Sequence, residues 1–173
     1  MKKIVIASFL LASFLYSNAQ VDDRTLILSL MPQIGFPVGE VKKTNGIILG
    51  GHFQVEKQIT NNSRILLQFG GGMLQGKKYD TEWGYEDSYP AIALTQLRGG
   101  AKYFMGQHIF IAGMAGAAQS NAEGKKSIGF SYAPVIGYEF LIGGNSDVNL
   151  RYDISTFNGY KVELATFSIG YHF

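Results

Sequence analysis

The last stretch of the chain, Val162–Phe173, alternates between apolar and polar positions. Its final apolar set is Phe167, Ile169, Tyr171 and Phe173, with small or polar residues between them. A period of two predicts a half-buried β-strand, because successive side chains of a strand point to opposite faces. A terminal aromatic would promote aggregation on an open sheet in water, whereas at the rim of a barrel closed in lipid it would join an aromatic girdle.

The same alternation recurs upstream and divides the chain into strand-like runs. Most runs set a nearly unbroken apolar face against a face with charged or amide groups. Pro32, in the middle of the first run, lacks a backbone donor and argues against a regular strand there. His108–Ala118 is apolar on both faces, so its phase stays open. The runs are Leu26–Val38, Ile47–Ile59, Arg64–Gln75, Ala91–Phe104, His108–Ala118, Ile128–Ile142, Asp147–Thr156 and Val162–Phe173.

The connections between these runs alternate in length. Short turns are expected at Thr60–Ser63, Met105–Gln107 and Gly143–Ser146, and long polar loops at Gly39–Gly46, Gly76–Pro90 and Gln119–Ser127. Outer-membrane barrels combine an even strand number with short turns at one end and long loops at the other. We therefore predict an all-β protein, an eight-stranded antiparallel up-and-down transmembrane β-barrel. A soluble lipocalin-like barrel remains an alternative, because alternation does not show which face points inward.

Aromatic residues support the membrane interpretation. On the apolar face they gather where strands are expected to meet the short turns, which is the place of an interfacial girdle. This set is Tyr103, Tyr138, Phe140, Tyr152, Tyr171 and Phe173.

The first 19 residues have the features of a cleaved secretory signal. Lys2 and Lys3 precede the apolar run Ile4–Leu15, and small residues precede Gln20. We therefore expect residues 1–19 to be a signal peptide and residues 20–173 to be one barrel domain. Cleavage removes two of the 15 basic residues and none of the 13 acidic ones, which leaves 13 of each. A balanced charge does not favour a nucleic-acid partner. The absence of cysteine excludes disulfides and thiolate chemistry.

With its aromatic period-two ending, the terminal strand resembles the C-terminal strand of bacterial outer-membrane barrels, which the barrel-assembly machinery recognises. The whole of Gln20–Phe173 resembles the small barrels of the OmpA/OmpX type. This resemblance implies the outer membrane of a Gram-negative bacterium, with lipid and lipopolysaccharide as surroundings, and it implies no cofactor. Outer-membrane lipid A deacylases and palmitoyltransferases share this barrel. The deacylase pattern needs a His two positions before a Ser on a late strand, where this chain has Asp153 before Ser155.

Charged residues on the polar face form the main candidate site. Eight strands enclose a space only wide enough for side chains, so these residues are expected to meet inside the barrel. Isolated charges there would each cost several kcal/mol, which favours hydrogen-bonded pairs and a closed lumen. A narrow wet channel is the alternative. The acids are Glu56, Glu139 and Asp153, and the bases are Arg98, Lys102 and Arg151.

A second candidate site is the loop Gly76–Pro90. Its aromatic residues suit either recognition of an extracellular ligand or contact with lipopolysaccharide; they are Tyr79, Trp83, Tyr85 and Tyr89. Its acids suit either a divalent cation or solvent; they are Asp80, Glu82, Glu86 and Asp87. The three histidines, His52, His108 and His172, lie on different runs and are interpreted as lumen or solvated residues rather than metal ligands.

No catalytic motif emerges from the sequence: it has no phosphate loop, nucleophile elbow or zinc spacing. We therefore expect a non-enzymatic integral outer-membrane barrel that stabilises the envelope or presents loops for binding. A lipid A-modifying enzyme and a soluble periplasmic carrier are the competing classes. The sequence does not define a loop ligand, conduction or oligomeric state.

Overall fold

The structure, a computed structural model, describes residues 26–80, 85–140 and 146–173. Eight strands within these residues close into one barrel in the order β1-β10-β9-β8-β7-β6-β3-β2, and all neighbouring strands are antiparallel. The predicted fold class is thereby confirmed. The barrel strands are β1 (Leu26–Val38), β2 (Asn45–Thr60), β3 (Ser63–Gly76), β6 (Ile92–Met105), β7 (Ile109–Ala122), β8 (Lys125–Phe140), β9 (Ser146–Phe157) and β10 (Tyr160–His172).

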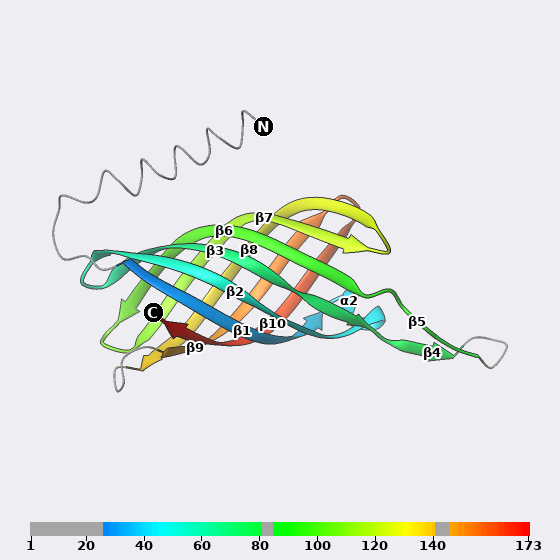
Figure 1. Cartoon of the computed structure of the whole chain (residues 1–173), viewed down its shortest axis with the longest axis horizontal. Coiled ribbons are helices and arrows are strands. Elements are labelled where there is room, and N and C mark those ends of the chain that lie inside the picture. Colours follow the sequence, from blue (N-terminus) through cyan, green and yellow to red (C-terminus); the bar gives the residue numbers. More distant parts are fainter. Residues whose placement is uncertain (1–25, 81–84, 141–145) are drawn as a thin grey trace, which may run out of the picture.

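The two ends of the barrel differ. β1 begins and β10 ends at one end, called here the terminus end, which lies to the left in Figure 1. The opposite end, the loop end, carries a short helix, α2 (Val41–Thr44), and a two-stranded arm formed by β4 (Lys78–Asp80) and β5 (Glu86–Ser88) (Figure 1). None of the described residues form a helix long and apolar enough to cross a membrane. The predicted signal peptide, residues 1–19, lies outside the described residues, as does most of the predicted turn Gly143–Ser146.

The barrel closes where the first and last strands pair. Ser29 of β1 faces His172 of β10, and Phe36 faces Ala165 near the loop end. The backbone amide of Phe173 donates to the carbonyl of Leu28 at 2.8 Å, so pairing continues to the end of the chain. Pro32 remains within β1, where it pairs with Gly51 of β2 and points outward. A proline is thus accommodated without ending the strand.

One predicted long loop is wrong. Gln119–Ser127 was expected to be a polar loop, but β7 and β8 continue through it and leave only Glu123 and Gly124 between them. Both residues have positive φ, 50° and 81°, as a tight two-residue hairpin turn requires. The polar composition misled the prediction, because polar residues occur in a hairpin at the barrel rim as well as in a loop. Gly76–Pro90 likewise contains the paired strands β4 and β5 rather than an unstructured loop.

Large apolar side chains cover the outside of the barrel. Aromatic pairs lie at the terminus end, where Tyr138 contacts Phe140 and Tyr171 contacts Phe173 in edge-on geometry. Tyr152 does not join them: it lies midway along β9 and pairs with Ala165, so its predicted place beside a short turn is wrong. The apolar belt therefore has an aromatic rim at the terminus end.

The lumen contains two apolar clusters that the period-two analysis did not identify. One closes the loop end and includes Val41 of α2 and the fully buried Leu74. The other includes Phe104, Phe110 and Met114 and lies along β3, β6, β7 and β8. It resolves the open phase of the fifth run, since Phe110 and Met114 of β7 point inward. Charged groups therefore share the lumen with two compact apolar regions.

The loop-end cluster provides a test of this packing. Replacing Leu74 with Ala should lower the free energy of unfolding by about 2–5 kcal/mol, because a cavity forms where no solvent enters. Leu150 is 59% exposed on the outer face, and its replacement should cost less because detergent or lipid fills the space. Urea unfolding of both variants in micelles measures the difference. Equal losses would contradict an apolar closure at this end.

Candidate functional site

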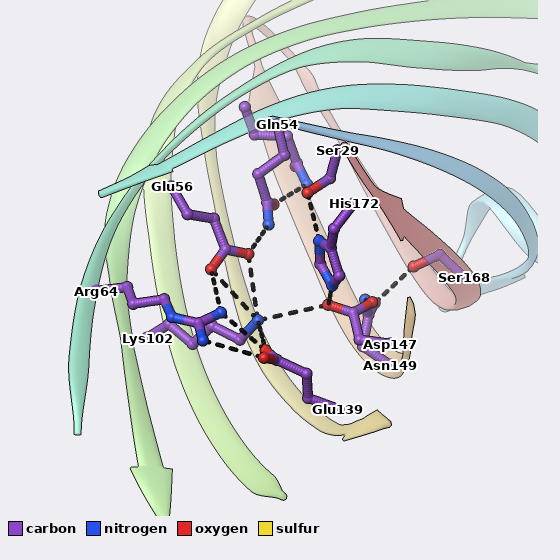
Figure 2. Close-up of polar contacts among 11 residues, drawn as sticks. Ser29, Gln54, Glu56, Arg64, Lys102, Glu139, Asp147, Asn149, Ser168 and His172 are labelled. Atoms are coloured by element: carbon purple, nitrogen blue, oxygen red, sulfur yellow. Dashed lines mark hydrogen bonds and ion pairs between the residues drawn. The ribbon is translucent and has the colours of Figure 1, made fainter. Parts of the chain in front are cut away.

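The six charged residues predicted to meet inside the barrel all have buried side chains in the lumen. They form two clusters. One lies towards the terminus end and contains Glu56, Lys102 and Glu139 (Figure 2). The other lies deeper and contains Arg98, Arg151 and Asp153. Inward-pointing positions of four strands, β2, β6, β8 and β9, supply these six side chains, because residues that alternate along each strand converge on the narrow interior.

Lys102 is the centre of the terminus-end cluster. Its Nζ lies 3.2 Å from Glu56 Oε1, 3.2 Å from Glu139 Oε2 and 3.4 Å from Asp147 Oδ2. The ammonium also lies 4.0 Å from the centre of the Phe110 ring. Three carboxylates and an aromatic face thus surround one buried cation, whose three donors are directed to different strands.

Arg64 closes the same cluster from β3. It forms a bidentate pair with Glu139, with Nη1–Oε2 at 2.8 Å and Nη2–Oε1 at 3.0 Å. Its Nη1 also lies 3.1 Å from Glu56 Oε2, and its guanidinium lies over the Phe104 ring at 4.6 Å. Fork-like pairing of this kind is stronger than a single contact and restricts geometry. Arg64 therefore joins β2, β3 and β8 at the terminus end.

Asp153 is the centre of the deeper cluster. One carboxylate oxygen accepts a hydrogen bond from Arg98, and the other accepts from Arg151 Nε at 2.8 Å and from Thr166 Oγ1 at 2.7 Å. Each arginine also donates to an amide oxygen: Arg98 donates to Gln68 at 2.7 Å, and Arg151 donates to Gln33. The single negative charge of Asp153 is thus shared between two buried arginines.

The two clusters together balance charge. The acids are Glu56, Glu139, Asp147 and Asp153, and the bases are Arg64, Arg98, Lys102 and Arg151. The pairing is redundant at Lys102 and Arg64, each of which has more than one carboxylate partner. The deeper cluster has no such alternative. Among the described residues, Asp153 is the only carboxylate that pairs with Arg98 or Arg151.

Sequence reasoning missed Arg64 and Asp147. Both have the inward phase: Arg64 lies four residues from Gln68, and Asp147 lies two residues from Asn149. They stand at the first positions of their runs, where alternation has no preceding residue to support it. Extending the period to the ends of the strands would have identified both.

His172 joins the closing seam to the charge network. Its Nδ1 lies 2.7 Å from Ser29 Oγ, and its Nε2 lies 3.6 Å from Asp147 Oδ2 (Figure 2). Serine, histidine and aspartate are the residue types of a nucleophilic triad, but Ser29 is fully buried and offers no surface to a substrate. The three residues instead connect β1, β10 and β9. These contacts therefore have a structural role at the seam.

Glu56, Asp147 and His172 also have the chemistry of metal ligands. Their candidate ligand atoms lie within 4.8 Å of one another and all three residues are buried. Lys102, however, contacts both carboxylates at 3.2–3.5 Å and supplies the cation between them. The other histidines lie apart: His52 contacts Gln96 at 3.2 Å, and His108 stacks on Tyr138. The arrangement favours an internal ion-pair network over a metal site.

The predicted surface residues lie on the arm and its base. Tyr79, Tyr85 and Tyr89 are exposed, and the Tyr79 and Tyr89 rings lie 4.6 Å apart. Tyr79 donates a hydrogen bond to Asp87 at 3.1 Å, and this bond to a carboxylate raises the pKa of Tyr79. Lys78 pairs with Glu86 at 2.9 Å. Trp83 and Glu82 lie outside the described residues. The arm thus presents aromatic rings on a hydrogen-bonded frame.

The four residues of the predicted assembly signal point outward from β10. Their exposed fractions range from 41% at Phe167 to 72% at Phe173. Ile169 and Tyr171 lie between them on the same face, and inward neighbours such as Ser168 join the lumen hydrogen bonds. One strand therefore carries an apolar outer stripe and a polar inner stripe.

Comparisons with known proteins show similarity of structure only. No protein-family model matches the chain, and no curated protein matches it. The structure of Ail, the attachment invasion locus protein of Yersinia pestis, solved with the heparin analogue sucrose octasulfate, is 12% identical over 87% of this chain and 97% of that chain, with a TM-score of 0.57. The N-terminal β-barrel domain of Pseudomonas aeruginosa OprF is 13% identical over 87% of this chain and all of that domain, with a TM-score of 0.57.

Neisserial surface protein A is similar in the same way, at 10% identity over 88% of this chain and all of that chain, with a TM-score of 0.57. At such low identity the likeness concerns the fold. The strand order, the closed barrel and these comparisons lead to one conclusion. The chain has the fold of the small eight-stranded outer-membrane β-barrels.

Proposed function

We propose that the protein is a non-enzymatic, non-conducting barrel of the outer membrane that anchors the β4–β5 arm at the cell surface. The observation that carries this proposal is the closure of the lumen by ion pairs between side chains from opposite walls. A barrel filled in this way does not transport solutes, so its exposed loop end is the part available for function.

The space left in the lumen supports closure. The cavity between the two charge clusters measures about 10 Å³ and is lined by residues such as Gln54, Lys102 and Asn149. A water molecule needs roughly 10–15 Å³ measured in this way, so the cavity holds at most one. The apolar cluster around Leu74 adds a second barrier at the loop end. These features favour the closed lumen over the narrow wet channel.

The outer face supports residence in a membrane. Outward positions of every barrel strand carry large apolar side chains, including Phe53, Phe69 and Leu97 at 43–57% exposure. A contiguous surface of this kind would aggregate in water but is solvated by lipid chains. With short turns at the terminus end and the arm at the other end, the usual arrangement of such barrels directs the arm outside.

The first experiment tests closure. The purified barrel should give no steady single-channel current in a planar bilayer, because paired side chains fill its cross-section. Steady currents from the unmodified protein would overturn the proposal.

The deeper cluster should control stability. Replacing Asp153 with Ala should lower the free energy of unfolding by about 3–5 kcal/mol, because it leaves two buried arginines without a carboxylate. Replacing Glu139 with Ala should lower the free energy of unfolding by less, since Arg64 and Lys102 both keep Glu56 as an ion-pair partner. Replacing Lys78, whose ion pair with Glu86 is exposed, should leave stability unchanged and serves as the control. Urea unfolding in micelles ranks the three variants, and a reversed order would count against the network.

A third prediction concerns assembly. Phe173→Lys should reduce insertion while leaving synthesis intact, since lysine on a lipid-facing site costs about 0–1 kcal/mol near the interface and the terminal aromatic is removed. Heat-modifiable gel mobility of membrane fractions measures the folded barrel. Phe130→Lys, on an exposed aromatic of β8, is the control for the charge alone. Normal folded levels of Phe173→Lys would remove the basis for a terminal signal.

A fourth prediction concerns topology. Protease added to intact cells should cut within the arm, where Lys78 and Tyr79 of β4 are exposed. The tight turn at Asn61 and Asn62 should be cut only after the envelope is opened. Cutting there in intact cells would show that the barrel is inverted.

A further inference from the structure

A groove of about 550 Å³ crosses the outer face of the barrel over β8, β9, β10 and β1. A row of alternating side-chain sizes creates it. Phe36 pairs with Ala165, and Ala165 pairs with Tyr152, so a small residue lies between two large aromatics. Phe167 and Leu150 form the wall on the terminus side. The lining is almost entirely apolar, and it is continuous with the apolar belt.

A basic residue lies beyond the groove, towards the loop end. Lys161 lies on the same face of β10 as Ala165, four residues nearer the loop end, or about 13 Å along the strand. Its side chain is 48% exposed. Glu163 accepts one of its hydrogen bonds at 2.6 Å, which leaves two of its three donors for another group.

We propose that this groove binds one acyl chain of lipid A, with the phosphorylated head group at Lys161. An apolar groove with an exposed cation beyond its loop-side end is complementary to an anionic amphiphile. The choice of lipid A rests on the proposed function, since a loop end outside the cell places the groove in the outer leaflet. The small side chain of Ala165 leaves the outer surface hollow between two aromatic rings, and this hollow distinguishes the site from the rest of the apolar belt.

The test uses barrel purified from outer membranes in mild detergent, without refolding, and analysed by native mass spectrometry. The unmodified protein should retain a species with the added mass of lipid A. Ala165→Phe fills the groove and should abolish that species. Ala117→Phe is the matched control, because Ala117 also lies between two large outward residues, Leu97 and Phe130, but outside the groove. Lys161→Gln should weaken retention, whereas Lys126→Gln should not.

Heat-modifiable mobility confirms that each variant is folded, and Ala165→Leu replaces Ala165→Phe where the larger residue prevents insertion. Absence of bound lipid from the unmodified barrel, or equal retention by the groove-filling variant, would overturn the proposal. A dimer of the unmodified barrel that Ala165→Phe disrupts would also overturn the proposal, because the groove would then be a contact between two copies of the chain. Retention of phospholipid in place of lipid A would overturn the choice of lipid and the orientation together. Failure of the proposed function is distinguishable from failure of lipid binding. A conducting barrel would give channel current in both the unmodified protein and the Ala165→Phe variant.

Discussion

The cost of burying charge inside a narrow barrel controls the rest of this structure. Eight strands leave no room for bulk water, so each inward lysine, arginine or carboxylate must find a partner inside the barrel. Lys102 meets carboxylates from β2, β8 and β9, and Asp153 meets arginines from β6 and β9. Satisfying these groups requires the walls to hold a fixed separation and register. The same contacts that lower the cost of burial also fill the lumen.

The sequence was most informative where one physical rule acts alone. Alternation of side chains along a strand is independent of neighbours, so the first run, Leu26–Val38, matches β1 at both ends. The same rule placed Glu56, Arg98 and Asp153 on the inner face before any contact was known. It failed at Gln119–Ser127, because a polar composition does not by itself distinguish a loop from a strand.

Pairing within the site could not be obtained from alternation. Strand register decides that Arg64 reaches Glu139, which is 75 positions away in sequence, and register follows from closure of the barrel as a whole. Nor did alternation show that Phe110 points inward, or that Leu74, which shares the phase of Gln68, packs in an apolar cluster. Their contribution depends on the volume left by the charged groups, which is a property of packing in three dimensions. Individual faces are therefore predictable, and the partners across the lumen are not.

The contacts at the seam connect closure of the barrel to formation of the network. His172 lies 143 residues from Ser29, and the hydrogen bond between them forms only when the last strand meets the first. Asp147 lies beside that histidine and also contacts Lys102, so the terminus-end cluster is complete only in the closed barrel. An open sheet would leave these groups in water, where separate pairs are worth little. The charged lumen therefore favours the closed state over partly closed ones, and it does so through side chains that come from both ends of the chain.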